Sequence, residues 1–169
     1  PGVGSFPDCS KGLKLIDGLV ETLSEEVINK EKPFLGICVG MQLMVDYSLE
    51  KIRTSGFGWL KGYLRKIKIS GEDYLGRKYK IPHMGWNNLK VSDKNHPILR
   101  NISEEEQFYF VHSYYLDKSL ESEVLANTIY NHEIPAIIGK KNYFGVQFHP
   151  EKSSFSGQKI ISNWLMWKP

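Results

Sequence analysis

Residues 34–42 read FLGICVGMQ and join a short apolar run to a helical pattern. The run is typical of a buried strand, and the pattern from Val39 to Tyr47 predicts a helix that follows at once. Cys38 therefore falls on a tight strand-to-helix turn, with Gly36 and Gly40 two positions to either side. Small flanking residues permit such a turn, which is the arrangement that presents a nucleophile at the edge of a sheet.

The position of Cys38 favours a reactive thiol. The positive end of the predicted helix stabilises the thiolate, which is the nucleophilic form of cysteine. The amide of Val39 would point at the same place. Alternatively, Cys38 is one more small buried apolar residue, which is the usual role of a lone cysteine. The two glycines favour a nucleophile, and a nucleophile of this kind needs a base.

His149 is the best candidate for that base among five histidines. It follows the apolar run 143–148, so we expect it at a strand end, and Pro150 and Glu151 come next. An imidazole that deprotonates a thiol needs a third group to fix its tautomer, and a carboxylate two residues on can turn back to do so. The competing interpretation is a surface histidine beside an unrelated glutamate.

The remaining pattern predicts an α/β fold in one domain over residues 1–169, without repeats or linkers. We expect an amphipathic helix over 13–29 and a closing helix over 158–167. The expected strands fall within 57–69, 108–115, 124–130, 135–139 and 143–148.

The composition excludes several classes of function. The net charge of +3 comes from scattered lysines and arginines rather than from a basic run, so we infer no nucleic-acid partner. No apolar stretch approaches the roughly 20 residues that span a bilayer, so no membrane role is expected. The only cysteines, Cys9 and Cys38, do not form a disulfide framework, which favours a reducing cytoplasm.

Two segments together resemble a known family. Residues 36–42 (GICVGMQ) and 144–151 (FGVQFHPE) resemble the two signatures of the class I glutamine amidotransferases. Residues 81–87, 1–4 and 112–115 are similar to the glutaminase subunit of imidazole glycerol phosphate synthase within that family. The resemblance implies a flavodoxin-like, three-layer α/β fold with a central, mostly parallel sheet. It also implies a strand and a helix ahead of residue 1, so that this chain is N-terminally incomplete.

The resemblance assigns roles to particular residues and implies no cofactor and no metal. Cys38 attacks the amide of glutamine, His149 acts as base and then as acid, and Glu151 orients His149. The oxyanion would be held by Val39 and by the turn at residues 1–4, which in this family rearranges only when a partner binds its own substrate. The oxyanion set is Val3, Gly4 and Val39, and the substrate set is Gln42, His112, Ser113 and Tyr114.

A separate set of residues predicts a partner interface. Exposed Trp and Met side chains are frequent at the centres of interfaces, so Trp86 is the expected anchor. Alternatively, Trp86 is buried in the core. In the family this surface faces a (β/α)8-barrel cyclase, whose interior conducts ammonia and which makes imidazole glycerol phosphate and AICAR in histidine biosynthesis. The predicted interface is His83, Met84, Trp86, Asn87, Tyr109 and Lys152.

Three alternatives to this function remain open from the sequence. Paralogous amidotransferases supply ammonia for amidination of a surface-polysaccharide sugar, and Val39 and residues 56–59 leave that branch open. A non-catalytic binding module would use the surface at Trp86 alone. A peptidase could use the same turn, although Gln42 and the turn at residues 1–4 match the amidotransferase pattern instead.

Overall fold

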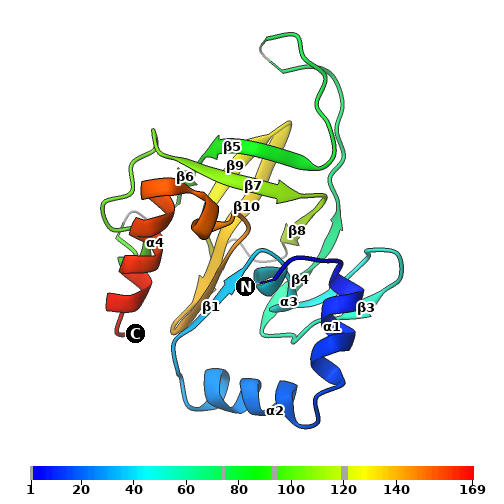
Figure 1. Cartoon of the computed structure of the whole chain (residues 1–169), viewed down its shortest axis with the longest axis vertical. Helices are drawn as coiled ribbons and strands as arrows, with labels where there is room; N and C mark the ends of the chain where they lie inside the picture. The colour runs from blue at the N-terminus through cyan, green and yellow to red at the C-terminus, as the bar shows by residue number, and fades with distance from the viewer. Residues whose placement is uncertain (1, 74, 93–94, 119–121) are drawn as a thin grey trace.

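A computed structural model describes residues 2–73, 75–92, 95–118 and 122–169 (Figure 1). In chain order the elements are α1 (Phe6–Lys14), α2 (Leu19–Ser24), the π-helix η1 (Glu25–Asn29), β1 (Phe34–Ile37), α3 (Val39–Leu43), β2 (Val45–Ser48), β3 (Thr54–Ser55), β4 (Leu60–Lys66), β5 (His83–Asn88), β6 (Lys90–Val91), the 3-10 helix η2 (Pro97–Leu99), β7 (Gln107–His112), β8 (Tyr114–Lys118), β9 (Val124–Tyr130), β10 (His132–Lys140), β11 (Tyr143–Val146), the 3-10 helix η3 (Pro150–Lys152) and α4 (Ser154–Met166). No helix in these ranges is both long enough and apolar enough to cross a bilayer.

The central sheet has five strands in the order β1-β11-β10-β9-β6. Only β1 and β11 pair in parallel in this sheet, and the other three pairings are antiparallel. The expected α/β architecture is present, but the expectation of a mostly parallel sheet is wrong for the described residues. The reason is the short connections from β9 to β10 and from β10 to β11, since parallel neighbours need long crossovers.

Two smaller sheets flank the central one. The first has the order β3-β2-β4-β8, with β2 and β4 parallel and the outer pairings antiparallel. The second is the antiparallel pair β5-β7. The expected strand over 108–115 is thus two strands in different sheets. The described residues of the segment between β4 and β5, which are 67–73 and 75–82, protrude from the body of the molecule (Figure 1).

Two expected helices differ from the structure. The helix predicted over 13–29 is divided, because α1 ends at Lys14 and Gly18 adopts a left-handed φ of 69° before α2. The helix predicted from Val39 ends at Leu43, and Val45 begins a strand. Pairing of β2 with β4, with Tyr47 stacked on Tyr63 at a centroid separation of 5.2 Å, overrides the local helical pattern. The closing helix is confirmed and begins earlier, at Ser154.

Apolar clusters lie on both faces of the central sheet. Tyr143 and Phe144 are neighbours on β11 and belong to different clusters. The first cluster packs α1 and α3 against the sheet, and the second includes Ile160 of α4. Burial on both faces explains why β10 and β11 are continuous apolar runs rather than alternating ones.

Two glycines on neighbouring strands make room for α3. Gly36 of β1 pairs with Gly145 of β11. A Cβ on Gly36 would lie 2.7 Å from backbone atoms of Gly40 and Met41, and a Cβ on Gly145 would lie 2.6 Å from Cβ of Met41. The helix therefore rests directly on the two strands. Gly40, the other glycine of the predicted bracket, faces open space, so it has no such steric role.

Gly36 and Gly40 give a matched pair of substitutions. We expect Gly36→Ala to lower the free energy of unfolding by about 2 kcal/mol or more, because the strand and helix must separate. Gly40→Ala, in a helix with open space around it, should leave the stability unchanged or raise it by about 0.5–1 kcal/mol. Denaturant unfolding measures both values. Equal stability of the two variants would contradict the packing described for α3.

Candidate active site

Cys38 occupies a strained turn between β1 and α3. Its φ of 52° and ψ of −111° are rare for any residue except glycine. The Cys38 N–H donates to the Val146 carbonyl at 2.8 Å, and its own carbonyl accepts from the Gln42 N–H at 3.1 Å. Backbone hydrogen bonds to the sheet on one side and to the helix on the other thus hold the turn. The expected strand-to-helix joint is confirmed.

The thiol of Cys38 is buried, with 9% of the residue exposed. Burial raises the pKa of the thiol to about 11, the hydrogen bond from the Val39 amide lowers it, and the Glu151 carboxylate raises it. The sulfur therefore keeps its proton at neutral pH in the chain alone. A nucleophilic role requires a base nearby, because the thiolate is the reactive form.

His149 has the tautomer that a base requires. Its Nδ1 lies 2.7 Å from Oε1 of Glu151. A carboxylate only accepts, so Nδ1 carries a proton, and in the neutral ring the lone pair is on Nε2. The His149 side chain is buried, and Nε2 has no hydrogen-bond partner among the described residues. A buried acceptor without a partner is costly in a folded protein and suggests a functional role.

The backbone of His149 is held by Tyr109 and Ser153. The His149 N–H donates to the Tyr109 carbonyl at 2.9 Å. Ser153 Oγ donates to the His149 carbonyl at 2.6 Å and accepts from the Tyr109 N–H at 2.9 Å. The strand pair β5-β7, which carries the predicted interface, is therefore bonded directly to the residue that we predict as the base.

A cavity of about 250 Å³ lies beside Cys38. It is lined by Gly4, Cys38, Val39, Gln42, Glu50, Pro82, Val111, His112, Ser113 and Tyr114. The structure thus brings together one cysteine, two of the three predicted oxyanion residues and all four predicted substrate residues. Glu50, Pro82 and Val111 were not predicted from the sequence.

The turn before α1 lies against Val39. A Cβ on Gly2 would be 2.6 Å from Val39 Cγ1, and Gly4 has a φ of 137° that disfavours other residues. Val3, the third predicted oxyanion residue, is 76% exposed. Pro1, which begins the predicted turn, lies outside the described residues.

Two histidines form a buried hydrogen-bonded chain that ends at the cavity. His112 Nδ1 lies 2.9 Å from the Tyr114 carbonyl, so this nitrogen carries the proton. His112 Nε2 then accepts from His83 Nδ1 at 3.1 Å, and His83 Nε2 accepts from Asn87 Nδ2 at 3.4 Å. Burial lowers the pKa of His83 to about 3 and that of His112 to about 4. Both imidazoles are therefore neutral at pH 7.

The predicted interface residues divide between the two faces of β5. Met84 and Trp86 point outward and are 61% and 50% exposed, whereas His83 is buried. The expectation that His83 forms part of the interface surface is therefore wrong, because strand alternation turns its ring inward between Phe110 and Tyr130. The alternative of a core Trp86 is also excluded. The Trp86 ring meets the Tyr109 ring edge-on, with centroids 5.9 Å apart.

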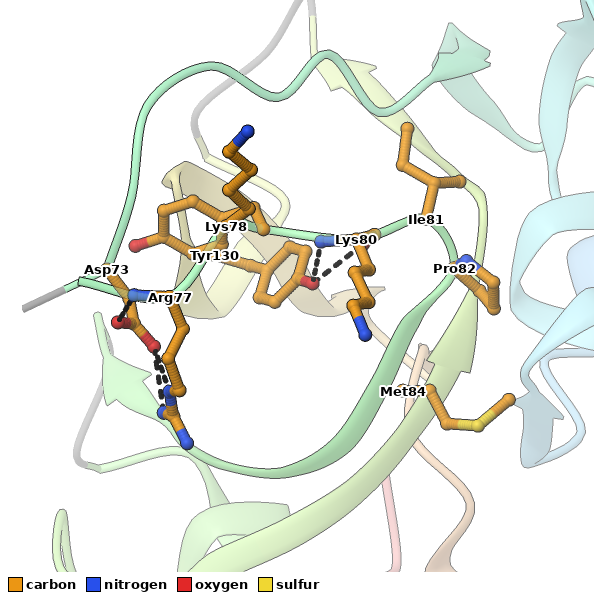
Figure 2. A pocket seen from close by; sticks show the side chains of 9 residues that line it. Asp73, Arg77, Lys78, Lys80, Ile81, Pro82, Met84 and Tyr130 are labelled. Carbon is orange, nitrogen blue, oxygen red and sulfur yellow. Dashed lines mark hydrogen bonds and ion pairs between the residues drawn. The ribbon is translucent and has the colours of Figure 1, made fainter. Parts of the chain in front are cut away.

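A second, larger cavity of about 690 Å³ is lined mostly by residues of the protruding segment (Figure 2). The Tyr130 hydroxyl accepts from the Lys80 N–H at 3.1 Å and donates to the Lys80 carbonyl at 2.7 Å. Met84 and Pro82 line this cavity, and Pro82 lines the Cys38 cavity as well. Cys38, Val39 and Gln42 line only the smaller cavity, so we place the chemistry there.

The chain belongs to the class I glutamine amidotransferase family. The family model for "Glutamine amidotransferase class-I" matches residues 1–167. Two solved structures share the fold. One, a glutamine amidotransferase, has a TM-score of 0.65 at 14% identity, and the match covers 96% of this chain and 76% of the other. A glutamine amidotransferase from Thermotoga maritima has a TM-score of 0.59 at 19% identity, covering 97% and 57%.

Curated relatives match with much higher identity. Imidazole glycerol phosphate synthase subunit HisH of Brucella suis is 46% identical over 172 residues. The same subunit of Rhodopseudomonas palustris is also 46% identical, and that of Cereibacter sphaeroides is 45% identical. Each alignment covers 100% of this chain and 77% of the relative.

Two further residues of the site were not predicted from the sequence. Gln147 is fully buried, with its Nε2 3.8 Å from Cys38 Sγ, and Ser153 holds the backbone of His149. Gln147 could have been found as the one amide within the apolar run 143–148. Ser153 gives no such signal, because a serine after a short turn is common.

The two buried histidines predict a loss of stability in acid. Below about pH 6.5 the unfolded chain protonates both histidines, whereas the folded chain holds them neutral down to about pH 4 and pH 3. The unfolded state then binds more protons, so the free energy of unfolding falls as the pH falls. Each histidine contributes a slope of up to about 1.4 kcal/mol per pH unit.

His83→Phe tests this slope. Phenylalanine keeps the stacking on Phe110 and Tyr130 and removes one titrating group. We expect denaturant unfolding between pH 6 and pH 4 to show a slope that is smaller by about one proton than in the wild type. An unchanged slope would contradict the neutral state assigned to His83.

Proposed function

We propose that this chain hydrolyses glutamine to glutamate and ammonia and passes the ammonia to a partner synthase. The observation that carries the proposal is the pair His149–Glu151, in which the carboxylate holds Nδ1 and Nε2 is buried without a partner among the described residues. The pair follows β11, which is paired with β1, the strand that precedes Cys38. Membership in the amidotransferase family and the strained backbone of Cys38 support it.

The chemistry follows from these three side chains. His149 Nε2 takes the proton of the Cys38 thiol while Sγ attacks the amide carbon of glutamine, and a C–S bond forms. His149 then gives the proton to the leaving nitrogen, so that ammonia departs and a thioester remains. Water, deprotonated by His149, hydrolyses the thioester to glutamate and restores the thiol. Glu151 keeps the imidazole in the required tautomer and stabilises its charged form.

The oxyanion of each tetrahedral intermediate needs backbone donors. The Val39 amide already points at the sulfur. The second donor in our proposal is an amide of the turn that contains Val3 and Gly4, and each such donor contributes roughly 3 kcal/mol to the transition state. Gly4 permits this turn to change conformation. We propose that the turn completes the oxyanion site only when the partner is bound, so that glutamine is not wasted.

The substrate residues supply the remaining contacts. Gln42 Nε2 donates to the Tyr114 carbonyl at 3.4 Å and to Gln147 Oε1 at 3.0 Å. With both hydrogens engaged, the oxygen of the Gln42 amide is the atom available to the substrate. The main-chain groups of Ser113 and Tyr114 would receive the amino-acid end of glutamine, and His112 fixes that segment through the Tyr114 carbonyl.

The partner in this proposal is a (β/α)8-barrel cyclase that makes imidazole glycerol phosphate and AICAR in histidine biosynthesis. The curated relatives at 46% identity carry the name of a subunit of that synthase, which favours this branch over the amidination of a sugar. The docking surface comprises Met84, Trp86, Tyr109 and Lys152, whereas the side chain of Asn87 lies on the other face of β5 with His83. Two free cysteines agree with assembly in a reducing cytoplasm.

Turnover of glutamine by the chain and its cognate barrel tests the function. We expect Cys38→Ala to abolish glutamate production, because no other thiol lies at the strained turn. Cys9→Ala is the matched control and should retain activity, since Cys9 lies on α1 and packs against the core. Full activity of Cys38→Ala would contradict the proposal.

The same assay tests the partner surface. The barrel with its bound ligand should raise turnover at least tenfold, and Trp86→Ala should remove most of that increase. Leu165→Ala, which truncates an exposed apolar side chain on α4, is the control. Stimulation of the same size in Trp86→Ala would show that the docking surface lies elsewhere. A cognate barrel that makes no imidazole glycerol phosphate would instead favour the paralogues that supply ammonia for amidination of a surface-polysaccharide sugar.

A further inference from the structure

Gln147 lies within the second family signature, residues 144–151, but the resemblance assigns it no role. It follows β11 directly, and its N–H donates to the Ala136 carbonyl of β10 at 2.8 Å. Gly145, two residues earlier, faces Met41 of α3, so the side chain of Gln147 points toward the same helix. The side chain is fully buried. Such an amide needs partners for both its oxygen and its nitrogen.

The orientation of the Gln147 amide is determined by a backbone carbonyl. The Tyr114 carbonyl can only accept, so Gln42 must present Nε2 to it, at 3.4 Å. The same nitrogen lies 3.0 Å from the Gln147 amide, which must therefore present its oxygen. The nitrogen of Gln147 is left facing Cys38 Sγ at 3.8 Å, a distance at which a sulfur atom accepts a hydrogen bond.

The reverse orientation is unfavourable on both sides. Rotating the Gln147 amide by half a turn would place its nitrogen against Gln42 Nε2, where two donors would meet. It would also place its oxygen beside the sulfur, where the charge of a thiolate would be repelled. The hydrogen-bond chain therefore runs one way, from Gln147 to Cys38 at one end and from Gln42 to Tyr114 at the other.

We propose that Gln147 is a positioning residue for the nucleophile, whose Nε2 donates to the Cys38 sulfur and holds it ready for attack. The proposal rests on the proposed function, because it assumes that this sulfur is the nucleophile. The role differs from that of the oxyanion donors, since Gln147 acts on the attacking atom and not on the substrate. It also links Gln42, the predicted substrate contact, to the sulfur through one amide.

Other groups around the sulfur also change the pKa of the Cys38 thiol. Burial, the Glu151 carboxylate and Cys9 raise the pKa of Cys38, while the Val39 amide and Lys152 lower it. Gln147 adds a neutral donor, which stabilises the thiolate without a charge. Loss of this donor should therefore be visible as a less acidic thiol, even when no glutamine is present.

The pH dependence of Cys38 alkylation by iodoacetamide tests the proposal in the free chain. Gln147→Met keeps the length of the side chain and removes the donor. We expect Cys38 to react roughly tenfold more slowly in this variant at each pH from 8 to 10, which corresponds to a rise of about one unit in its pKa. Alkylation of Cys9, resolved by mass spectrometry in the same sample, should be unchanged and serves as the internal control.

Gln147→Glu is the second variant. It keeps an acceptor for Gln42 and places a carboxylate beside the sulfur, so Cys38 should react more slowly than in Gln147→Met. Equal reactivity of Cys38 in the wild type and in either folded variant would overturn the proposal. Because alkylation requires no glutamine, this outcome is distinct from a chain that lacks glutaminase activity.

A measurement on the wild type covers the case in which both variants fail to fold. The side-chain amide resonances of Gln147 should shift with pH as Cys38 titrates, and the shift should vanish in Cys38→Ser. Amide resonances of Gln147 that do not respond to the ionisation of Cys38 would also overturn the proposal.

Discussion

The parallel pairing of β1 with β11 is the constraint on which the site depends. Ile37 pairs with Val146, and the next residue of β1, Cys38, donates its N–H to the Val146 carbonyl. The chain continues from the end of β11 through Gln147 to His149. Parallel neighbours end on the same side of a sheet, so the nucleophile candidate and the base candidate both follow strands at the same end of the sheet. A shift of one residue in register would turn the side chains to the opposite face.

The same pairing positions the helix that follows Cys38. Gly36 and Gly145 lie opposite each other, and the absence of two side chains lets α3 approach the sheet closely. This approach directs the Val39 amide at the sulfur and brings Gln42 to the cavity. On the other side, Tyr109 connects β7 to the backbone of His149. The exposed surface at Trp86 is thus one strand away from the residue that we propose as the base.

Much of the site could be predicted from the sequence, because its signals are local. The change from an apolar run to a helical pattern at Cys38 specifies a turn, and the apolar run before His149 specifies a strand end, without reference to the rest of the chain. The roles of Gln147 and His83 could not be predicted in this way. Both depend on which atoms of distant segments meet them, namely Gln42 from α3 and His112 from β7. Strand alternation in β5 would have shown that His83 and Trp86 cannot share a surface.

Less of the fold than of the site could be predicted from the sequence. The local pattern does not reveal that the segment after Leu43 pairs with β4, and the family resemblance overstated the parallel character of the central sheet. Those features depend on the lengths of the connections and on pairing between distant strands. The helix predicted over 13–29 failed for a local reason, since Gly18 breaks it.

Covalent labelling by a chloroketone analogue of glutamine tests the central claim most directly, because the reagent needs the cavity, the sulfur and the base together. Mass spectrometry of the chain bound to its cognate barrel should show one label, on Cys38, and labelling should be at least a hundredfold slower in His149→Gln. Label on Cys9, or equal rates with and without the imidazole of His149, would show that the pairing of β1 and β11 does not create the catalytic unit described for this chain.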